Sequence, residues 1–336
     1  MTRLERHWYR PTLWLTALLA PLEGLFALIS WVRRLAYRRG WCASVALPVP
    51  VVVVGNINVG GVGKTPLTVA LLQALQARGV KVGVISRGYG GGHVRPTLVT
   101  PQSSAQLVGD EPLLLAAAGA PVVVGRNRVA AGQYLLQQHP DLQLLLTDDG
   151  LQHYRLRRDL ELVVLDGARG LGNGHLLPAG PLREPASRLA SVDAIVVNGK
   201  LAETLLTLPA DVPRFDMTLQ PGELYRLDDP AQRCTPAMLQ GQQVVALAGI
   251  GHPERFFTTL QQLGVTLAAT VALPDHHALT VADIPAEADA VIITAKDAVK
   301  LPPGNHARLW VLPVAAQLEP DLADWTLARL KIRHGR

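Results

Sequence analysis

Apolar runs of strand length recur along the first two hundred residues. Six of them consist almost entirely of valine, leucine and isoleucine and lie at residues 51–55, 82–86, 122–125, 143–147, 161–166 and 194–198. Segments of helical length, such as 67–79 and 111–120, separate most of these runs. Strands that are apolar throughout are typical of a parallel sheet covered on both faces. The pattern therefore predicts an α/β domain built on a mostly parallel, doubly wound sheet.

The pattern changes after residue 166. Residues 167–190 are rich in glycine and proline, and such long irregular segments are usually functional or mobile. Strand-like runs resume at 243–251, 290–294 and 309–314. We therefore expect four parts: an N-terminal helix (1–40), a core (41–205), a linker (206–240) and a smaller C-terminal α/β lobe (241–336).

A different apolar pattern occupies residues 12–32. On a helix, its larger apolar side chains share one side: Leu18, Leu22, Leu25, Ile29 and Val32. Glu23 argues against a spanning helix, because a carboxylate at the centre of a bilayer costs roughly 2.5–3.5 kcal/mol. Tryptophans and arginines at both ends favour an amphipathic helix lying in the membrane interface. A helix packed on its own domain and a signal peptide are the alternatives.

The net charge of +5 belongs entirely to this N-terminal segment. Residues 1–41 hold seven arginines against two glutamates, so the rest of the chain is neutral. This distribution does not indicate nucleic-acid binding. Cys42 and Cys234 lie far apart, which matches no disulfide framework, redox motif or zinc site.

Residues 51–66 read VVVVGNINVGGVGKTP, a strand that runs into a glycine-rich loop. Backbone N–H groups of such a loop surround a polyphosphate, and the helix that follows adds partial positive charge. Lys64 is expected at the β- and γ-phosphates, Thr65 on Mg²⁺, and Pro66 in the first helical turn. The predicted nucleotide-binding residues are Asn58, Val59, Gly60, Gly61, Val62, Gly63, Lys64 and Thr65.

Asn58 stands where this loop motif has its first glycine. We interpret it as a turn residue, because asparagine tolerates left-handed backbone conformations. The loop also needs an acidic residue at the end of a neighbouring strand to hold the magnesium shell. Asp148 and Asp149 follow an apolar run and suit this role, since adjacent carboxylates need a cation. A solvated turn at these residues, or Asp166 in their place, are the alternatives.

The identity of the nucleotide can be narrowed. No Asn-Lys-x-Asp motif for guanine is present, which favours ATP. The loop also resembles those of chromosome-partitioning ATPases, which carry a signature lysine at the position of Val59. The valine counts against an ATPase switch that works by dimerisation.

Two further clusters have the chemistry for phosphoryl transfer. Asp110 and Glu111 precede a predicted helix, and Asp275, His276 and His277 are consecutive in the second lobe. A carboxylate or an imidazole can accept the proton of a hydroxyl that attacks a phosphate. Each cluster also has a plainer interpretation, Asp110 as a helix cap and the histidine pair as a surface loop. Metal binding by the second cluster lacks further obvious ligands.

The motifs taken together resemble those of the tetraacyldisaccharide 4′-kinase family, the lipid A 4′-kinases of Gram-negative bacteria. The similarity runs to about residue 301 and rests on nine segments: GNINVGGVGKTP (55–66), SRGYGG (86–91), VGDEPLLLA (108–116), VGRNRVAA (124–131), TDDGLQHYRLRRDLELVVLD (147–166), LLPAGPLREP (176–185), AGIGHPERFF (248–257), PDHHALT (274–280) and TAKDAVKL (294–301).

The resemblance implies a P-loop core joined to a smaller lobe. It implies transfer of the γ-phosphate of ATP, with Mg²⁺, to the 4′-hydroxyl of tetraacyldisaccharide 1-phosphate, a glycolipid. It also implies monotopic attachment to the cytoplasmic face of the inner membrane. Neither a nucleic acid nor an obligate protein partner is implied.

The resemblance also assigns roles to residues. Asp110 becomes the base that activates the sugar hydroxyl, with His276 as its partner from the second lobe. Asp148 and Asp149 serve the metal and its water shell, and Glu111 assists. The remaining assignments are Lys64 to phosphate, Thr65 to Mg²⁺ and Arg183 to substrate phosphate or transition-state charge.

Two other functions stay open from the sequence. One is a membrane-bound ATPase switch or a metallochaperone-like ATPase, which hydrolyses ATP without a lipid. The other is a membrane-surface binding module whose phosphate loop is degenerate.

Overall fold

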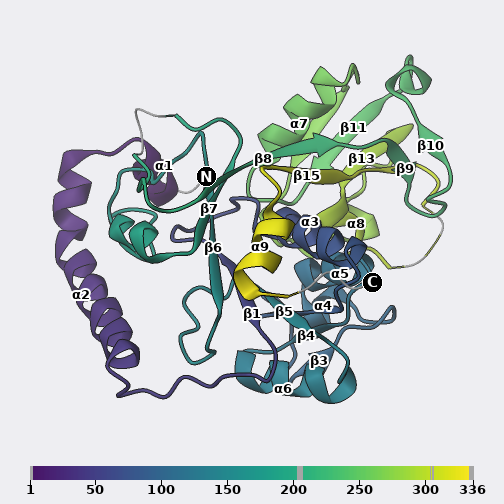
Figure 1. The fold of residues 1–336 in the computed structure, drawn as a ribbon. Coiled ribbons are helices and arrows are strands. Elements are labelled where there is room, and N and C mark those ends of the chain that lie inside the picture. The colour runs from purple at the N-terminus through teal and green to yellow at the C-terminus, as the bar shows by residue number, and fades with distance from the viewer. Residues whose placement is uncertain (1–2, 203–206, 303, 305, 333–336) are drawn as a thin grey trace.

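The chain forms two β-sheets with one long helix along the outside (Figure 1). The computed structural model describes residues 3–202, 207–302, 304 and 306–332. The first sheet has nine strands and the second has six. The α/β class and the mostly parallel sheet predicted from the apolar runs are confirmed.

The first sheet has its parallel centre where the apolar runs lie. Its order is β15-β8-β7-β6-β1-β5-β2-β4-β3, and only the edge strands β15 and β3 are antiparallel to their neighbours. The strands are β1 (Val51–Gly55), β2 (Val82–Ser86), β3 (Thr97–Leu98), β4 (Val122–Val124), β5 (Leu144–Asp148), β6 (Leu160–Asp166), β7 (Ala194–Asn198), β8 (Arg214–Pro221) and β15 (Val314–Glu319). Every residue of β1, β2, β5, β6 and β7 is buried, as expected for strands covered on both faces.

Two hydrophobic clusters lie on the two faces of this sheet. One contains side chains of α3 (Lys64–Ala77), α5 (Asp110–Ala117) and α9 (Leu322–Leu330). The other contains α6 (Arg128–Gln138) and apolar residues of the glycine- and proline-rich segment, including Leu171 and Leu182. That segment is therefore a packed cover of the sheet.

The second sheet has the order β10-β9-β14-β13-β11-β12, parallel from β14 to β12. Its strands are β9 (Leu224–Arg226), β10 (Arg233–Cys234), β11 (Val244–Ala248), β12 (Ala269–Ala272), β13 (Ala290–Thr294) and β14 (Leu309–Leu312). The accompanying and remaining short helices are α4 (Ala105–Val108), α7 (Pro253–Gln262), α8 (Ala295–Ala298), η1 (Ala186–Ser191), η2 (Pro236–Leu239) and η3 (Val281–Asp283).

The order of the chain does not separate the two sheets cleanly. The segment 206–240, expected to be a linker, contributes β8 to the first sheet and β9 and β10 to the second. After completing the second sheet, the chain returns to the first as β15, and α9 then packs on α3. Two connections therefore join the sheets.

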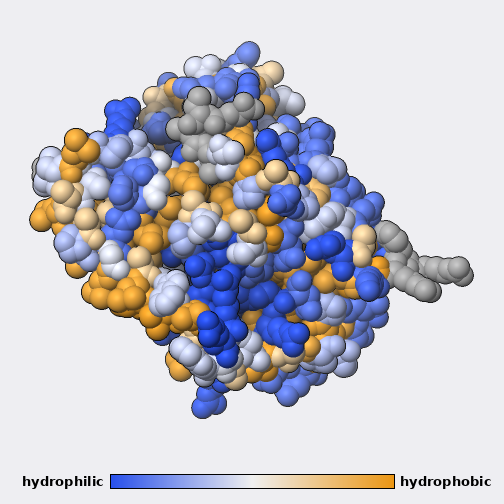
Figure 2. All heavy atoms as spheres, turned by 60° about the vertical axis from the view of Figure 1, so that its left-hand side comes forward, coloured by the Kyte–Doolittle hydropathy of each residue, from blue (hydrophilic) through white to orange (hydrophobic). Residues whose placement is uncertain are grey.

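The N-terminal segment forms α1 (Arg3–Tyr9) and α2 (Leu13–Arg38), and α2 has no buried residue. Leu18, Leu22, Leu25, Ile29 and Val32 are between 46% and 65% exposed. The opposite side contacts the protein: Glu23 accepts a hydrogen bond from the backbone N–H of Leu176 (2.7 Å) and pairs with His175 (3.0 Å). Figure 2, in which the side of α2 is turned forward, shows hydrophobic and hydrophilic areas next to each other.

A core helix turns its apolar side toward the protein, whereas α2 turns its polar side toward it. By length and composition it is the one helix among the described residues that could cross a membrane. Its apolar side chains face outward, and its central carboxylate is held by the protein. These features favour association with a membrane along the helix.

We expect replacement of Leu18, Leu22 and Leu25 with glutamine to weaken membrane binding without affecting the fold. Substitutions at exposed positions usually change stability by less than about 0.5 kcal/mol, whereas a leucine buried in lipid contributes about 1.5–3 kcal/mol. Thermal unfolding and co-sedimentation with vesicles measure the two effects. The matched control replaces Val94, Met238 and Val281, which are also exposed apolar residues. If both variants lost vesicle binding equally, the assignment of α2 as the membrane-binding helix would be refuted.

Candidate active site

The glycine-rich loop joins β1 to α3 at the centre of the first sheet. Gly60 and Gly63 have φ angles of 108° and 98°, in the left-handed region that favours glycine. A Cβ atom at Gly63 would lie 2.7 Å from Nδ2 of Asn198 and 2.9 Å from Cε of Met217. Helix α3 begins at Lys64, with Pro66 in its first turn, as predicted. The loop therefore presents the N-terminus of a 14-residue helix at the carboxyl end of the sheet.

The explanation given above for Asn58 is wrong. Its φ is not positive, and its backbone forms an antiparallel bridge with Leu182, while its side chain is buried. The glycine- and proline-rich segment makes this bridge and also accepts the N–H of Val59 through the carbonyl of Pro181 (2.8 Å). Asn58 is thus part of the attachment between the loop and that segment. A turn conformation is not required of it.

Asp148 ends β5 directly beside the loop. Its carboxylate accepts hydrogen bonds from the hydroxyls of Thr65 (3.3 Å) and Thr68 (3.4 Å), and its side chain is buried. Burial, together with the negative charge of Glu111, raises the pKa of Asp148 to about 7. A cation at this carboxylate would remove that cost.

Asp149 has the opposite electrostatic environment, although it is the next residue. Its Oδ1 lies 3.6 Å from Nζ of Lys64 and 3.1 Å from Nη2 of Arg183. Burial alone would raise its pKa, but these two charges lower the pKa to about 2. Its φ of 49° lies in the left-handed region, which is uncommon for a residue other than glycine.

Two polar residues around this acidic pair were not expected from the sequence. Asn56 is fully buried, and its Oδ1 accepts hydrogen bonds from Lys64 (3.4 Å) and from Arg183. Arg128, also buried, donates to the carbonyls of Asp148 (3.3 Å) and Asp149 (3.4 Å). Both lie in the recognised segments GNINVGG and VGRNRVAA, which was the available signal. Arg183 itself, which was predicted, comes from the glycine- and proline-rich segment and lies beside Lys64.

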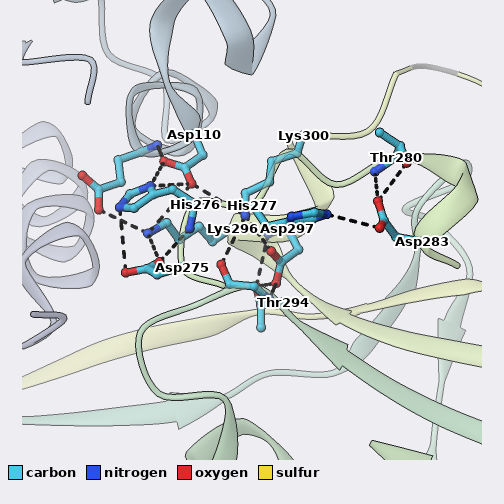
Figure 3. Close-up of polar contacts among 12 residues, drawn as sticks. Asp110, Asp275, His276, His277, Thr280, Asp283, Thr294, Lys296, Asp297 and Lys300 are labelled. Carbon is cyan, nitrogen blue, oxygen red and sulfur yellow. Dashed lines mark hydrogen bonds and ion pairs between the residues drawn. The ribbon is translucent and has the colours of Figure 1, made fainter. Parts of the chain in front are cut away.

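The second part of the site lies where the two sheets meet. Asp110 is buried at the start of α5, and its carboxylate oxygens lie 3.1 and 3.2 Å from Nδ1 of His276, which comes from the second lobe (Figure 3). Burial would raise the pKa of Asp110, but the hydrogen bond with His276 and the charge of Lys296 lower it. The same hydrogen bond raises the pKa of His276. The pair therefore consists of an ionised carboxylate beside an imidazole that protonates readily.

Two lysines of the second lobe complete this cluster, and the sequence analysis assigned no role to them. Nζ of Lys296 lies 3.8 Å from Asp110, 3.5 Å from Glu111 and 3.2 Å from Asp275. Lys300 lies 3.8 Å from Asp110 and is held by the fully buried Asp297 (2.8 Å). Both lie in TAKDAVKL, with Lys296 in α8 and Lys300 two residues beyond its end.

Figure 3 also shows which predicted residues do not converge. His277 points away from Asp110 and pairs with Asp283 (3.2 Å). Asp166, the alternative to Asp148, is buried and pairs with Arg255 of α7 (2.8 Å). Glu111 lies between the two parts of the site, since it pairs with Lys296 and its charge acts on Asp148. A Cβ atom at Gly251 would lie 3.6 Å from the N of Gly61, so the second lobe also contacts the phosphate loop.

The donors at the phosphate loop suit Mg²⁺. Magnesium is commonly bound by one or two carboxylates together with phosphate oxygens of a substrate. The hydroxyl of Thr65 and the carboxylate of Asp148 are oxygen donors 3.3 Å apart. Over the described ranges, the protein has no group of three or more His, Cys, Asp or Glu side chains that could hold a metal by itself. Any magnesium here would therefore depend on nucleotide oxygens.

Comparison with known proteins identifies one family. The family model described as tetraacyldisaccharide-1-P 4′-kinase (LpxK) matches residues 15–331. The tetraacyldisaccharide 4′-kinase of Chromobacterium violaceum is 66% identical over 341 residues and covers 100% of both chains. That of Neisseria meningitidis serogroup C is 50% identical over 98% of this chain and 96% of its own. The crystal structure of "apo" form LpxK from Aquifex aeolicus in complex with ATP has a TM-score of 0.77 at 28% identity, covering 94% of this chain and 98% of that one.

The raised pKa of Asp148 predicts a pH-dependent stability. Between about pH 4 and pH 7 the folded protein holds a proton at Asp148 that the unfolded chain has lost, so stability falls as the pH rises through this window. In buffer free of metal and nucleotide, Asp148→Asn should therefore gain thermal stability relative to the wild type between pH 5 and pH 7.5. Asp141→Asn, which removes an exposed carboxylate, is the control and should show no such trend. If the thermal stability of Asp148→Asn and that of the wild type changed with pH in parallel, the raised pKa of Asp148 would be contradicted.

Proposed function

The chain belongs to the tetraacyldisaccharide-1-P 4′-kinase family, and we propose that the residues described above carry out its reaction. It is an ATP-dependent kinase of lipid A biosynthesis that phosphorylates the 4′-hydroxyl of tetraacyldisaccharide 1-phosphate. The observation that carries our assignment of roles is the buried Asp110–His276 pair, shared between the two lobes beside the phosphate loop.

We propose that residues 58–65 bind the triphosphate of ATP; the similar LpxK from Aquifex aeolicus was crystallised in complex with ATP. The backbone N–H groups of the glycine loop and the N-terminus of α3 surround the phosphates. Mg²⁺ would be held by Thr65 and Asp148, with Asp149 and Glu111 acting on its water shell, and when bound it neutralises negative charge on the β- and γ-phosphates. With a pKa of about 7, Asp148 is only partly ionised near neutral pH, and a bound cation favours its ionised form.

Asp110 accepts the proton of the 4′-hydroxyl as the sugar oxygen attacks the γ-phosphorus. The bond between that phosphorus and the β,γ-bridging oxygen breaks, which leaves ADP and the 4′-phosphorylated lipid. The lowered pKa keeps Asp110 ionised and ready to accept a proton. A weak base suffices in this reaction, because phosphoryl transfer has a loose transition state with little bond formation to the attacking oxygen. His276 orients the carboxylate through its hydrogen bond to Asp110 (3.1 Å).

Lys64 and Arg183 stabilise the charge of the transferred phosphoryl group. Both are anchored by Asn56 and Asp149, so their positive groups are positioned before the substrate arrives. Arg183 is a fork-shaped donor that suits phosphate oxygens. Lys296 is a positioning residue, because it ties Asp110 and Glu111 of one lobe to Asp275 of the other.

We further propose that the two sheets act as two lobes that close over ATP and the sugar. Closure brings Asp110 and His276 together, as they are in this structure, and shields the transferred phosphate from water, which limits hydrolysis of ATP. The outward apolar side of α2 supports a monotopic enzyme on the cytoplasmic face of the inner membrane, where its lipid substrate lies. Neither a nucleic acid nor an obligate protein partner is part of this proposal.

The role of Asp110 predicts a large loss of turnover. Asp110→Asn keeps the size of the side chain but removes the base, and we expect kcat to fall about 10²–10⁴-fold with an unchanged affinity for ATP. Steady-state kinetics and nucleotide binding measure these two quantities. Asp211→Asn, an exposed carboxylate on the first lobe's surface, is the control and should retain full activity. Near-normal turnover of Asp110→Asn would remove Asp110 from this role.

The overall reaction is tested with ATP, Mg²⁺ and the disaccharide 1-phosphate in detergent. We expect phosphate at the 4′ position with the wild type and almost none with Lys64→Ala, because Lys64 lies at the phosphates. Hydrolysis of ATP is measured in parallel with and without lipid. Lipid-independent hydrolysis coupled to nucleotide-dependent dimerisation would favour the ATPase switch instead. Activity that survives Lys64→Ala would instead indicate a degenerate loop.

A further inference from the structure

A cavity of about 260 Å³ lies between the C-terminal end of α2 and the first sheet. It is lined by residues that follow β5 and by residues of η1. Its charged lining residues are Arg34, Arg38, Arg157, Arg158, Arg188 and Glu161, with a net charge of +4. We call it the arginine pocket.

Two of its arginines are neutralised within the protein. Arg158 pairs with Glu161 (2.9 Å), and the buried Arg188 pairs with Glu161 and with Glu184 (3.1 Å). Glu184 also accepts a hydrogen bond from the hydroxyl of Tyr154 (2.7 Å). These ion pairs and hydrogen bonds hold the side chains at the base of the pocket in place without a bound ligand.

The other three arginines are uncompensated. The guanidinium groups of Arg34, Arg38 and Arg157 make no hydrogen bond and no ion pair with any residue that the structure describes. Positive groups that converge on a cavity without a counter-charge repel one another, and an anion with several oxygen acceptors relieves that repulsion. A phosphate group accepts paired N–H groups from arginine especially well.

The position of the arginine pocket indicates where its anion comes from. Arg34 and Arg38 belong to the same helix as Leu25, Ile29 and Val32, which are exposed on its apolar side. A helix whose apolar side lies in the acyl region holds its flanking arginines at the level of the lipid headgroups. The pocket would then open among phosphate groups that are attached to lipids.

The end of α2 that carries Arg34 and Arg38 is also connected to the transfer site by hydrogen bonds. Arg33 of α2 donates to the carbonyl of Gln152 (3.2 Å), and the side chain of Gln152 donates to the carbonyl of Asn56 (3.1 Å). Asn56 in turn accepts from Lys64. An occupant that fixes this end of α2 therefore acts on the segment that orients the phosphate-loop lysine.

We propose that the arginine pocket binds a phosphate group carried by a membrane lipid and thereby seats the kinase on the bilayer. Two lipids have this chemistry: an anionic phospholipid of the bilayer, and the substrate through its 1-phosphate. The second source rests on the proposed function, whereas the first does not.

The test uses the full chain with Arg34, Arg38 and Arg157 all replaced by glutamine. These side chains have no partners to lose, so thermal unfolding should match the wild type. The control replaces Arg95, Arg214 and Arg233, which removes the same charge from exposed positions elsewhere. One assay measures binding to phosphatidylcholine vesicles with and without phosphatidylglycerol, in the absence of substrate. The other measures KM for the disaccharide 1-phosphate and for ATP in neutral detergent.

If the occupant is a bilayer phospholipid, phosphatidylglycerol strengthens vesicle binding of the wild type, and the pocket variant loses this gain. Its loss of affinity is about tenfold larger than that of the control. If the occupant is the substrate, KM for the disaccharide 1-phosphate rises while KM for ATP and vesicle binding match the control. A pocket variant that equals the control in both assays overturns the proposal. Because vesicle binding needs no turnover, its outcome is independent of whether the kinase assignment holds.

Discussion

The buried carboxylate of Asp110 is the group on which the arrangement of the two sheets depends. A buried charge is costly unless opposite charges and hydrogen bonds compensate it. Asp110 belongs to the first lobe, but His276, Lys296 and Lys300, which compensate it, all belong to the second. The contact between the lobes is therefore electrostatic at its centre, and the same contact that stabilises Asp110 assembles the proposed catalytic pair.

At the phosphate loop, two adjacent carboxylates have different electrostatic surroundings. Asp148 and Asp149 are adjacent, but Asp148 accepts hydrogen bonds from hydroxyls and lies near the negative charge of Glu111, while Asp149 meets Lys64 and Arg183. Their pKa values consequently move in opposite directions, to about 7 and about 2. One side chain is suited to a cation, and the other fixes the lysine and arginine that face the phosphates. Two identical side chains thus acquire different roles from their surroundings alone.

The N-terminal helix α2 also has two sides with different surroundings. On its polar side Glu23 contacts His175, and its apolar side has no protein to cover it. Two of its arginines, Arg34 and Arg38, line one cavity together with arginines that follow β5. The enzyme's lipid contact and its phosphate chemistry are joined through Gln152 and Asn56.

The sequence by itself determined the features that depend on neighbours in the chain. The strand at 51–55, the glycine loop and the start of α3 follow from apolar runs, glycine and proline within sixteen residues, and Asp148 from its place at a strand end. Strands β8 and β15 went unseen because they are half exposed and β15 pairs only with the distant β8, although the alternating polar and apolar residues at 214–217 were a readable signal. Asn58 was misread for a related reason, since its bridge partner Leu182 lies far along the chain.

Only the tertiary structure decided which distant charges meet. Composition and motif order suggested Asp110 and His276, through resemblance to a family, but no local pattern places Lys296 against Asp110 and Glu111 or leaves Arg34, Arg38 and Arg157 around one cavity. Such contacts depend on the relative position of two sheets and a helix. Long-range Coulomb interactions and burial are set by that position, and they fix the pKa values and the roles of the residues.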